Sequence, residues 1–190
     1  MAQFIVLEGL DGAGTTTQSK LLKEYFGTDC FWDKEPTDLP TGLKIREVLR
    51  DHTPLTPQEM LSLFIQDREE HQAVLKEELL QGRKVVLDRY LLSTMAYQGL
   101  DFNLDYLYTL NQHFLVPDIT FLLDIDPEIS FARLEEKKEL FEKLDLQQKI
   151  RKNYLLAVDI LQKAGWNIIL LDGNQNIQYL HEKIAKHLKE

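Results

Sequence analysis

The first residues whose types and spacing could do chemistry form a glycine-rich segment near the amino end. Residues 9–16 read Gly-Leu-Asp-Gly-Ala-Gly-Thr-Thr, which fits the pattern G-x-x-x-x-G-K-[ST] at every position except the lysine. In such a loop, successive backbone N–H groups surround an anion, and the positive end of the following helix faces it. The segment therefore predicts a nucleotide-phosphate site made of Gly9, Leu10, Asp11, Gly12, Ala13, Gly14, Thr15 and Thr16.

The position of the motif's lysine holds Thr15, and Thr16 places a hydroxyl where the Mg²⁺ ligand of the motif belongs. The lysine normally neutralises the phosphates during transfer, whereas the backbone does most of the binding. Its loss therefore affects catalysis more than phosphate binding, and either another cation substitutes or transfer is slow. The alternative interpretation is a strand-to-helix turn that is merely rich in glycine.

Composition limits the partners of such a site. The chain has 22 Lys and Arg against 31 Asp and Glu, a net charge of −9, which argues against a nucleic-acid partner because that calls for a clustered basic surface. A local basic pocket for a small phosphorylated ligand remains compatible with an acidic body. The single cysteine, Cys30, cannot form an internal disulfide, which favours a reducing, cytoplasmic location.

The length and the hydropathy of the sequence predict one domain over residues 1–190 and no membrane partner. The length is that of one ordinary domain. Residues 1–8 lack the basic start of a signal peptide, and no apolar run approaches the roughly 18–20 residues of a membrane span.

The elements that must position the loop alternate between strand and helix. Residues 84–88 read Lys-Val-Val-Leu-Asp, which is typical of a strand buried on both faces, and Thr56 to Glu59 form a capping pattern that starts a helix. We expect strands over 3–8, 30–32, 84–88, 118–124 and 167–171, and helices over 15–25, 41–50, 56–81, 101–115, 127–133, 144–163 and 177 to the end.

This alternation predicts an α/β fold with three layers, in which helices cover both faces of a five-stranded parallel sheet. Ligands of such folds lie at the carboxyl ends of the strands. Four residues of interest fall at those ends, namely Gly9, Glu35, Asp88 and Asp124.

Residues 86–99, Val-Leu-Asp-Arg-Tyr-Leu-Leu-Ser-Thr-Met-Ala-Tyr-Gln-Gly, closely resemble the signature of the thymidylate kinases. Three further stretches resemble the same family in the same order: Lys34-Glu35-Pro36 with Gly42 and Ile45-Arg46, Leu63 to Arg68 with His71, and Pro117-Asp118 with Leu123 to Pro127. The resemblance covers about residues 3–160, and it is the combination that is specific to the family.

The resemblance implies a P-loop NTPase-like kinase with a helical lid at about residues 134–144. It implies that ATP phosphorylates dTMP to dTDP with Mg²⁺, for deoxynucleotide biosynthesis, usually in a homodimer. Two alternatives stay open: a related kinase with another pyrimidine acceptor, and a catalytically weak or silent nucleotide-binding protein.

On the acceptor side, the resemblance implies that Phe64 stacks on the pyrimidine and that Arg68, four residues later on the same helical face, donates to a base carbonyl. Arg89 would hold the monophosphate as a bidentate clamp. The structural alternatives are a core role for Phe64 and an ion pair from Arg89 to Asp88 or Glu35.

Further roles follow from the same resemblance. Ser93 and Gln98 resemble base-contacting positions, Tyr97 resembles the aromatic residue that closes on the sugar, and Glu35 lies in a substrate-binding segment. Asp11 would reach the acceptor sugar or the metal-bound phosphates. Asp88 would join Thr16 near Mg²⁺.

The expected lid departs from the family pattern, because Leu140 stands where an arginine commonly precedes a Phe/Tyr-Glu pair. We hypothesise that Lys137, Lys138 or Arg133 supplies the charge that Thr15 lacks. The alternative is that residues 135–143 form a solvated helical surface of alternating charge.

Overall fold

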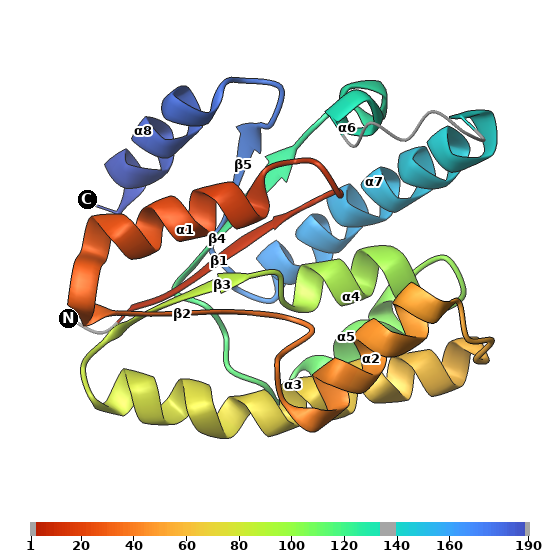
Figure 1. Ribbon diagram of the computed structural model, residues 1–190, viewed down its shortest axis with the longest axis horizontal. Coiled ribbons are helices and arrows are strands. Elements are labelled where there is room, and N and C mark those ends of the chain that lie inside the picture. Colours follow the sequence, from red (N-terminus) through yellow and green to blue (C-terminus); the bar gives the residue numbers. More distant parts are fainter. Residues whose placement is uncertain (1–2, 134–139, 189–190) are drawn as a thin grey trace.

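A computed structural model describes residues 3–133 and 140–188 of the chain, with side chains described outside 140–143. Its centre is a five-stranded sheet in the order β2-β3-β1-β4-β5, and all four strand pairings are parallel (Figure 1). The strands are β1 Gln3–Gly9, β2 Cys30–Lys34, β3 Lys84–Asp88, β4 Ile119–Asp124 and β5 Ile168–Asp172. The expected α/β fold with a five-stranded parallel sheet is confirmed.

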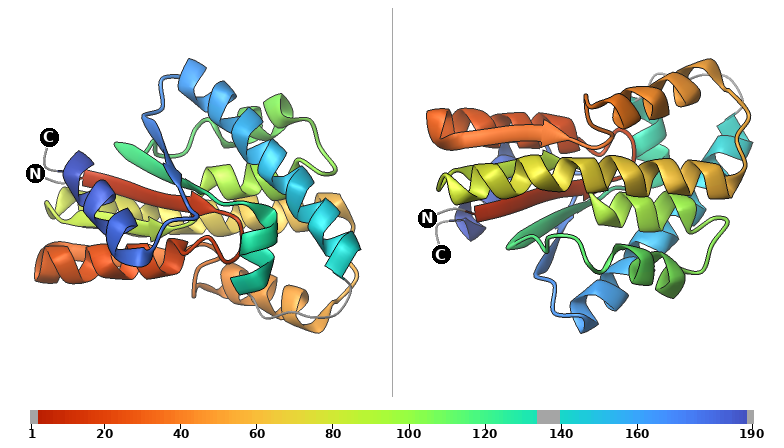
Figure 2. Two further views of the ribbon diagram at one scale, coloured as in Figure 1. Left: turned by 90° about the horizontal axis from the view of Figure 1, so that it is seen from above. Right: turned by 90° about the horizontal axis from the view of Figure 1, so that it is seen from below.

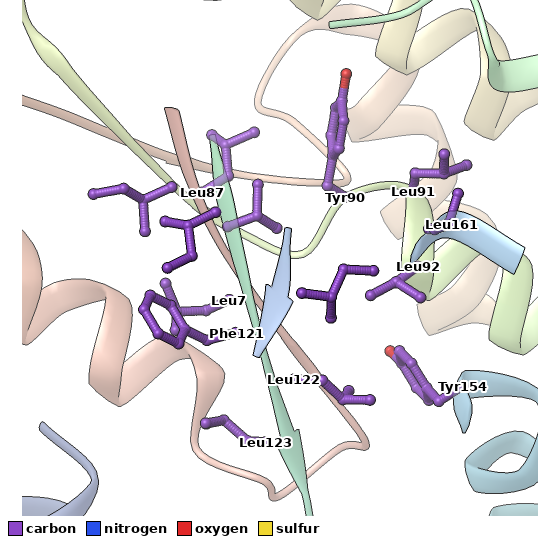
Figure 3. Packing of buried hydrophobic residues seen from close by; sticks show 14 of the residues in the cluster. Leu7, Leu87, Tyr90, Leu91, Leu92, Phe121, Leu122, Leu123, Tyr154 and Leu161 are labelled. Atoms are coloured by element: carbon purple, nitrogen blue, oxygen red, sulfur yellow. The ribbon is translucent and has the colours of Figure 1, made fainter. Parts of the chain in front are cut away.

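The central strands are β1, β3 and β4, and their apolar side chains are buried on both faces of the sheet. Leu7, Leu87 and Phe121 are fully buried and belong to one core (Figure 3). The edge strand β5 alternates buried and more exposed residues instead. This explains why the central strands read as continuous apolar runs in the sequence.

The helices are α1 Thr15–Phe26, α2 Pro40–Asp51, α3 Pro57–Leu80, α4 Leu91–Gln98, α5 Leu104–Asn111, α6 Pro127–Arg133, α7 Leu140–Lys163 and α8 Ile177–His187, with a 3₁₀ turn η1 at Gly27–Asp29. Helices α1 and α8 pack together on one side of the sheet, and α3, α4 and α7 lie on the other (Figures 1 and 2). No helix within the described ranges is long and apolar enough to cross a membrane.

Several helix boundaries agree with their local chemistry. At α3, Thr56 Oγ1 accepts from the N–H of Glu59 at 3.3 Å, and Glu59 Oε2 accepts from the N–H of Thr56 at 2.8 Å. This is the expected capping box. The helix expected over 101–115 is shorter, because Asn103 Oδ1 accepts from the N–H of Asp105 and so caps α5 at Leu104.

Two further differences concern helices. Helix α4 has no counterpart among the expected elements: five of its eight residues are buried, so it lacks the polar face that makes a helix visible in a sequence. Helix α7 begins at Leu140, four residues before the expected start. Of the expected lid, residues 134–139 lie outside the described residues, and with them Lys137 and Lys138.

Candidate active site

The glycine loop connects β1 to α1, at the carboxyl end of the sheet. A Cβ at Gly9 would lie 2.9 Å from both Ala13 Cβ and the carbonyl oxygen of Leu123, so the loop folds tightly onto β4. Gly14 has φ +97° immediately before the first turn of α1, a conformation that other residues rarely adopt. The chain thus needs glycine at both positions to bring its backbone N–H groups to the start of the helix.

Thr15 is buried beneath this loop. Its side chain is 95% shielded from solvent, and Thr15 Cγ2 lies 3.4 Å from the place a Gly9 Cβ would occupy. A short side chain packed in this way cannot stand in for a lysine that extends over the phosphates. The loop itself therefore contributes no cationic side chain.

Thr16 and Asp88 meet at the amino end of α1. Thr16 Oγ1 donates a hydrogen bond to Asp88 Oδ2, while Asp88 Oδ1 is buried and has no hydrogen-bond partner among the described residues. Carboxylate and hydroxyl oxygens are ligands that Mg²⁺ accepts, and Mg²⁺ usually takes few protein ligands together with phosphate oxygens and water. The unpartnered carboxylate oxygen makes these two residues fit a Mg²⁺ ion that arrives with a nucleotide.

Arg89 follows β3 and crosses toward the loop. Its backbone has φ +73°, its N–H donates to the carbonyl of Leu7 at 2.8 Å, and Nη1 donates to the carbonyl of Gly9 at 2.8 Å. Nη2 pairs with Asp11 Oδ1 at 2.6 Å. The ion partner of Arg89 is therefore Asp11, and the alternative pairing with Asp88 or Glu35 was wrong.

The surroundings hold Arg89 firmly charged. Burial acts against the charge, but Tyr154, Tyr97, Asp11 and Glu8 outweigh it and raise the pKa of Arg89 above its ordinary value. The guanidinium also lies 5.6 Å from the centre of the Tyr97 ring. Such a fixed, planar cation suits a bidentate phosphate contact.

A cavity of about 320 Å³ opens in front of Arg89. All of the residues predicted for the acceptor side line it, namely Asp11, Glu35, Phe64, Arg68, Arg89, Ser93, Tyr97 and Gln98. These residues come from the loop, from the segment after β2, from α3, from the turn after β3 and from α4. The structure thus brings together a set that spans almost 90 positions of the sequence.

Arg68 is the most deeply buried of this set, with 1% of its surface exposed. Nε and Nη2 donate to Glu35 Oε2 at 3.0 and 2.7 Å, Nη1 donates to Asn111 Oδ1 at 2.7 Å, and Nη2 donates to Thr94 Oγ1 at 2.9 Å. Sequence reasoning missed Asn111 and Thr94. Thr94 lies inside the signature next to Ser93, whereas nothing local marks Asn111, which lies 43 positions from Arg68.

His71 extends this network away from the cavity. The imidazole is fully buried, with Nδ1 3.1 Å from Glu35 Oε1 and Nε2 3.3 Å from Asp33 Oδ2. Burial alone would lower the pKa of His71, but the neighbouring carboxylates of Asp33 and Glu35 outweigh it and raise the pKa to about 9. A positively charged His71 therefore stands behind Glu35 at neutral pH.

A second group of residues that sequence reasoning missed lies beneath the loop. Glu8 is fully buried and accepts hydrogen bonds from the N–H of Tyr90 at 2.8 Å and from Ser93 Oγ. Ser93 Oγ also lies 2.8 Å from Tyr154 Oη, which donates to the carbonyl of Gly9 at 2.9 Å. The hydroxyl of Ser93 therefore bonds to Glu8 and Tyr154, whereas the family resemblance implies that Ser93 contacts the base.

A second cavity, of about 530 Å³, lies on the other side of the loop. Its lining includes Gly12, Ala13, Gly14, Thr17, Gln18, Arg133 and residues 175–178. Arg133 Nη1 donates to the carbonyl of Gly12 at 3.2 Å, so this cation touches the loop. Asp11 lines one cavity and the residues that follow it line the other, so the loop separates two ligand-sized spaces.

Comparisons with known proteins agree with this arrangement. The sequence model of the family described as thymidylate kinase matches residues 7–184. A protein of Methanocaldococcus jannaschii described as a probable thymidylate kinase is 40% identical over 190 residues, which cover 98% of this chain and 95% of that protein. One of Thermococcus kodakarensis with the same description is 37% identical, covering 95% and 94% of the two chains.

The solved structure of thymidylate kinase from Candida albicans is similar in its fold. It superposes with a TM-score of 0.85 at 26% sequence identity, covering 99% of this chain and 91% of that one. The two-cavity site, the family match and these relatives agree with one another. The chain therefore belongs to the thymidylate kinase family, the phosphotransferases that phosphorylate dTMP.

Proposed function

We propose that the chain transfers the terminal phosphate of ATP to the phosphate of dTMP across the glycine loop. ATP would occupy the cavity beside Arg133, and dTMP the cavity in front of Arg89. The observation that carries this proposal is that Asp11 and Gly12, which are adjacent in the loop, line different cavities. Phosphoryl transfer depends mainly on positioning and charge neutralisation, and the loop is where both phosphate groups would meet.

The acceptor cavity supports a pyrimidine deoxynucleoside monophosphate. Phe64 offers an aromatic face to the base, and Arg68 is oriented beside it by Glu35, Asn111 and Thr94. Because these partners fix the guanidinium before any ligand arrives, little entropy is lost when it binds a base carbonyl. Tyr97 and Gln98 would contact the sugar and the base from α4.

Arg89 would bind the phosphate of the acceptor. In the ligand-free protein its Nη2 is held by Asp11, an exposed carboxylate, so this arm of the guanidinium is pre-positioned at the mouth of the cavity. Bidentate contact with a phosphate is favoured by the planar fork of arginine. Thr16 and Asp88 would hold Mg²⁺, which neutralises phosphate charge when bound.

Arg133 is the described cation that best compensates for Thr15. It lies against the loop carbonyl of Gly12 and lines the donor cavity, whereas Thr15 is packed away from both cavities. We therefore assign to Arg133 the neutralisation that the loop lysine would supply. Lys137 and Lys138 stay as predictions.

A coupled ADP-release assay tests the proposal, with ATP, Mg²⁺ and, in turn, dTMP, dUMP, dCMP, UMP and thymidine. We expect turnover with dTMP and a lower kcat/KM with every other acceptor. Higher turnover with another pyrimidine nucleotide would favour the related kinase. Nucleotide binding without turnover of any acceptor would favour the catalytically silent protein.

We also propose that the protein forms a homodimer and works in the cytoplasm. Leu43 and Leu49 on α2 are each more than half exposed, as is Leu80 at the end of α3, so apolar surface is available on these helices. Light scattering on the purified protein tests the dimer, and Leu43→Glu should shift it toward the monomer. The lone Cys30 is buried, consistent with a compartment that forms no disulfides.

A further inference from the structure

A chain of oxygen atoms runs beneath the loop from Glu8 to Gly9. Glu8 Oε2 contacts Ser93 Oγ, Ser93 Oγ lies 2.8 Å from Tyr154 Oη, and Tyr154 Oη lies 2.9 Å from the carbonyl oxygen of Gly9. The members come from β1, α4 and α7, and Glu8 and Tyr154 are almost wholly shielded from solvent. Arg89 Nη1 lies against this series of oxygens and donates to the Gly9 carbonyl at 2.8 Å, to Tyr154 Oη at 3.1 Å and to Ser93 Oγ at 3.2 Å.

The number of hydrogen atoms in this chain depends on Glu8. The three oxygen–oxygen contacts between Glu8 and Gly9 need three hydrogens if each is to be a hydrogen bond. The hydroxyls of Ser93 and Tyr154 supply one each. With Glu8 ionised, Ser93 donates to Glu8 and Tyr154 donates to Gly9, so Ser93 and Tyr154 face each other with lone pairs that Arg89 Nη1 bridges at 3.2 and 3.1 Å. With Glu8 protonated, its O–H donates to Ser93, Ser93 donates to Tyr154, and Tyr154 donates to Gly9, so every contact holds a hydrogen.

The charge around the cluster favours the same state. The charged or titratable groups that act on the cluster are Arg89 after β3, Asp11 in the loop, Tyr97 on α4 and Tyr154 on α7. With Glu8 and Asp11 both ionised, Arg89 is one cation between two carboxylates. A phosphate dianion placed against Arg89 would add two more negative charges, and nearby negative charge raises the pKa of a carboxyl group.

Glu8 is already close to taking up a proton before any ligand arrives. Burial raises the pKa of Glu8 to about 7, while the hydrogen bond from Ser93 and the charge of Arg89 oppose the rise. A bound dianion would offset the positive charge of Arg89, so that this charge lowers the pKa of Glu8 less than it does in the ligand-free protein. The carboxyl group therefore responds to what Arg89 binds.

We propose that Glu8 is a positioning residue for the acceptor phosphate and takes up one proton from solvent when a phosphomonoester dianion binds against Arg89. This inference rests on the proposed role of Arg89. The proton from the buffer acid forms a new O–H bond on Glu8, which then donates to Ser93. With Glu8 neutral, the hydrogen-bonded oxygens of Ser93, Tyr154 and Gly9 stay in place around Arg89 Nη1. Binding of the dianion then adds one negative charge to the site instead of two.

Calorimetric titration of dTMP into the ATP-free protein at pH 8 tests the proposal, performed in two buffers of different ionisation enthalpy. The variant Glu8→Gln is the matched control, because its amide can accept from the N–H of Tyr90 and donate to Ser93 without titrating. The phosphate's own protonation is common to both proteins and cancels in their difference. We expect the wild type to take up close to one more proton per dTMP than Glu8→Gln.

Thymidine serves as the ligand control, since it lacks the phosphate and should give equal proton counts for the two proteins. The KM for dTMP should rise in the wild type as pH increases from 7 to 9 and change less in Glu8→Gln. Binding of dTMP with equal proton counts in both proteins would overturn the role of Glu8 and leave the proposed function intact. Failure of the wild type to bind dTMP would instead overturn the proposed function and, with it, this inference.

If Glu8→Gln does not fold, infrared difference spectra of the wild type with ¹³C-labelled glutamate give a second readout. Addition of dTMP should produce the carbonyl band of a protonated glutamic acid, and thymidine should not. An unchanged glutamate spectrum with dTMP bound would refute the proton uptake.

Discussion

Each of the two arginines in the acceptor cavity is paired with a carboxylate in the ligand-free protein. Arg68 pairs with Glu35 inside the protein, where both side chains are nearly inaccessible to solvent, and Arg89 pairs with the more exposed Asp11. The first pair fixes an orientation, whereas in the proposed function the second exchanges Asp11 for the acceptor phosphate. Losing one member of a buried pair leaves a charge without compensation.

We predict that Arg68→Met destabilises the protein by about 3–5 kcal/mol, because Glu35 would remain buried beside His71 without its main partner. Denaturant unfolding measures the change. The double variant Arg68→Met with Glu35→Gln should recover part of the loss. An equal or greater loss in the double variant would show that the packing of Arg68, and not its charge, is what matters.

At the loop, we predict that Arg133→Ala lowers kcat by about 10- to 1000-fold, as expected when a donor that stabilises transferred charge is removed. The melting temperature should stay the same, because Arg133 is exposed and its contacts are to backbone carbonyls. Steady-state kinetics and thermal unfolding measure the two quantities.

The companion variant is Thr15→Lys, which we expect to keep the activity or raise it. If Arg133 replaces the missing lysine, Thr15→Lys should restore most of the kcat lost in Arg133→Ala. Complete loss of activity in Thr15→Lys alone would mean that the phosphates lie differently in this loop.

At the scale of elements, α2 is held against the substrate-binding segment by close approach at Gly42. A Cβ there would lie 2.2 Å from the carbonyl oxygen of Thr37 and 2.6 Å from Asp67 Oδ1. Asp67 on α3 in turn accepts from the N–H of Thr37 at 3.0 Å. The contact ties α2, α3 and the segment that carries Glu35 into one wall of the cavity.

We therefore predict that Gly42→Ala costs about 1–3 kcal/mol of unfolding free energy, since the added methyl group must displace backbone atoms. The KM for dTMP should rise with it, because the displaced segment carries Glu35. Lys44→Ala, at an exposed position of α2 two residues further along, is the control and should change neither quantity much. A normal KM in Gly42→Ala would separate this wall from acceptor binding.

For the whole molecule, the buried titratable groups predict how stability depends on pH. The folded state raises the pKa of Glu8 to about 7 and that of His71 to about 9. A group whose pKa is raised on folding stabilises the protein fully below its unfolded pKa and loses that contribution as pH rises through the folded pKa. For Glu8 the loss falls between about pH 4.5 and 7, and for His71 between about pH 6.5 and 9.

We predict that the free energy of unfolding decreases from pH 6 to pH 9.5. Of this decrease, about 3 kcal/mol comes from His71, since each pKa unit corresponds to about 1.4 kcal/mol. Unfolding by urea across this range measures it. His71→Gln should flatten the curve above pH 6.5, whereas Glu8→Gln should flatten it below pH 7. Parallel curves for wild type and His71→Gln would contradict a charged imidazole between Asp33 and Glu35.

Much of this protein could be predicted from short stretches of its sequence. The strand–loop–helix turn at residues 9–16 and the buried strand Lys84–Asp88 agree with the sequence-based prediction, because glycine placement and apolar runs act over fewer than ten residues. The capping box at Thr56 is equally local. The residues predicted for the acceptor side came from a family resemblance, and the structure gathers them in one cavity.

Only the tertiary structure decided which side chains these residues meet. Ser93 bonds to Glu8 across 85 positions, and Arg68 bonds to Asn111 across 43, so neither contact leaves a periodic trace in the sequence. Helix α4 was missed for a related reason, because its residues are buried by α5 and α7. The sequence by itself determined the glycine loop at residues 9–16 and the strands of the sheet that carries it. The order of those strands in the sheet decided which buried carboxylate lies behind each arginine, because it sets which chain segments become neighbours.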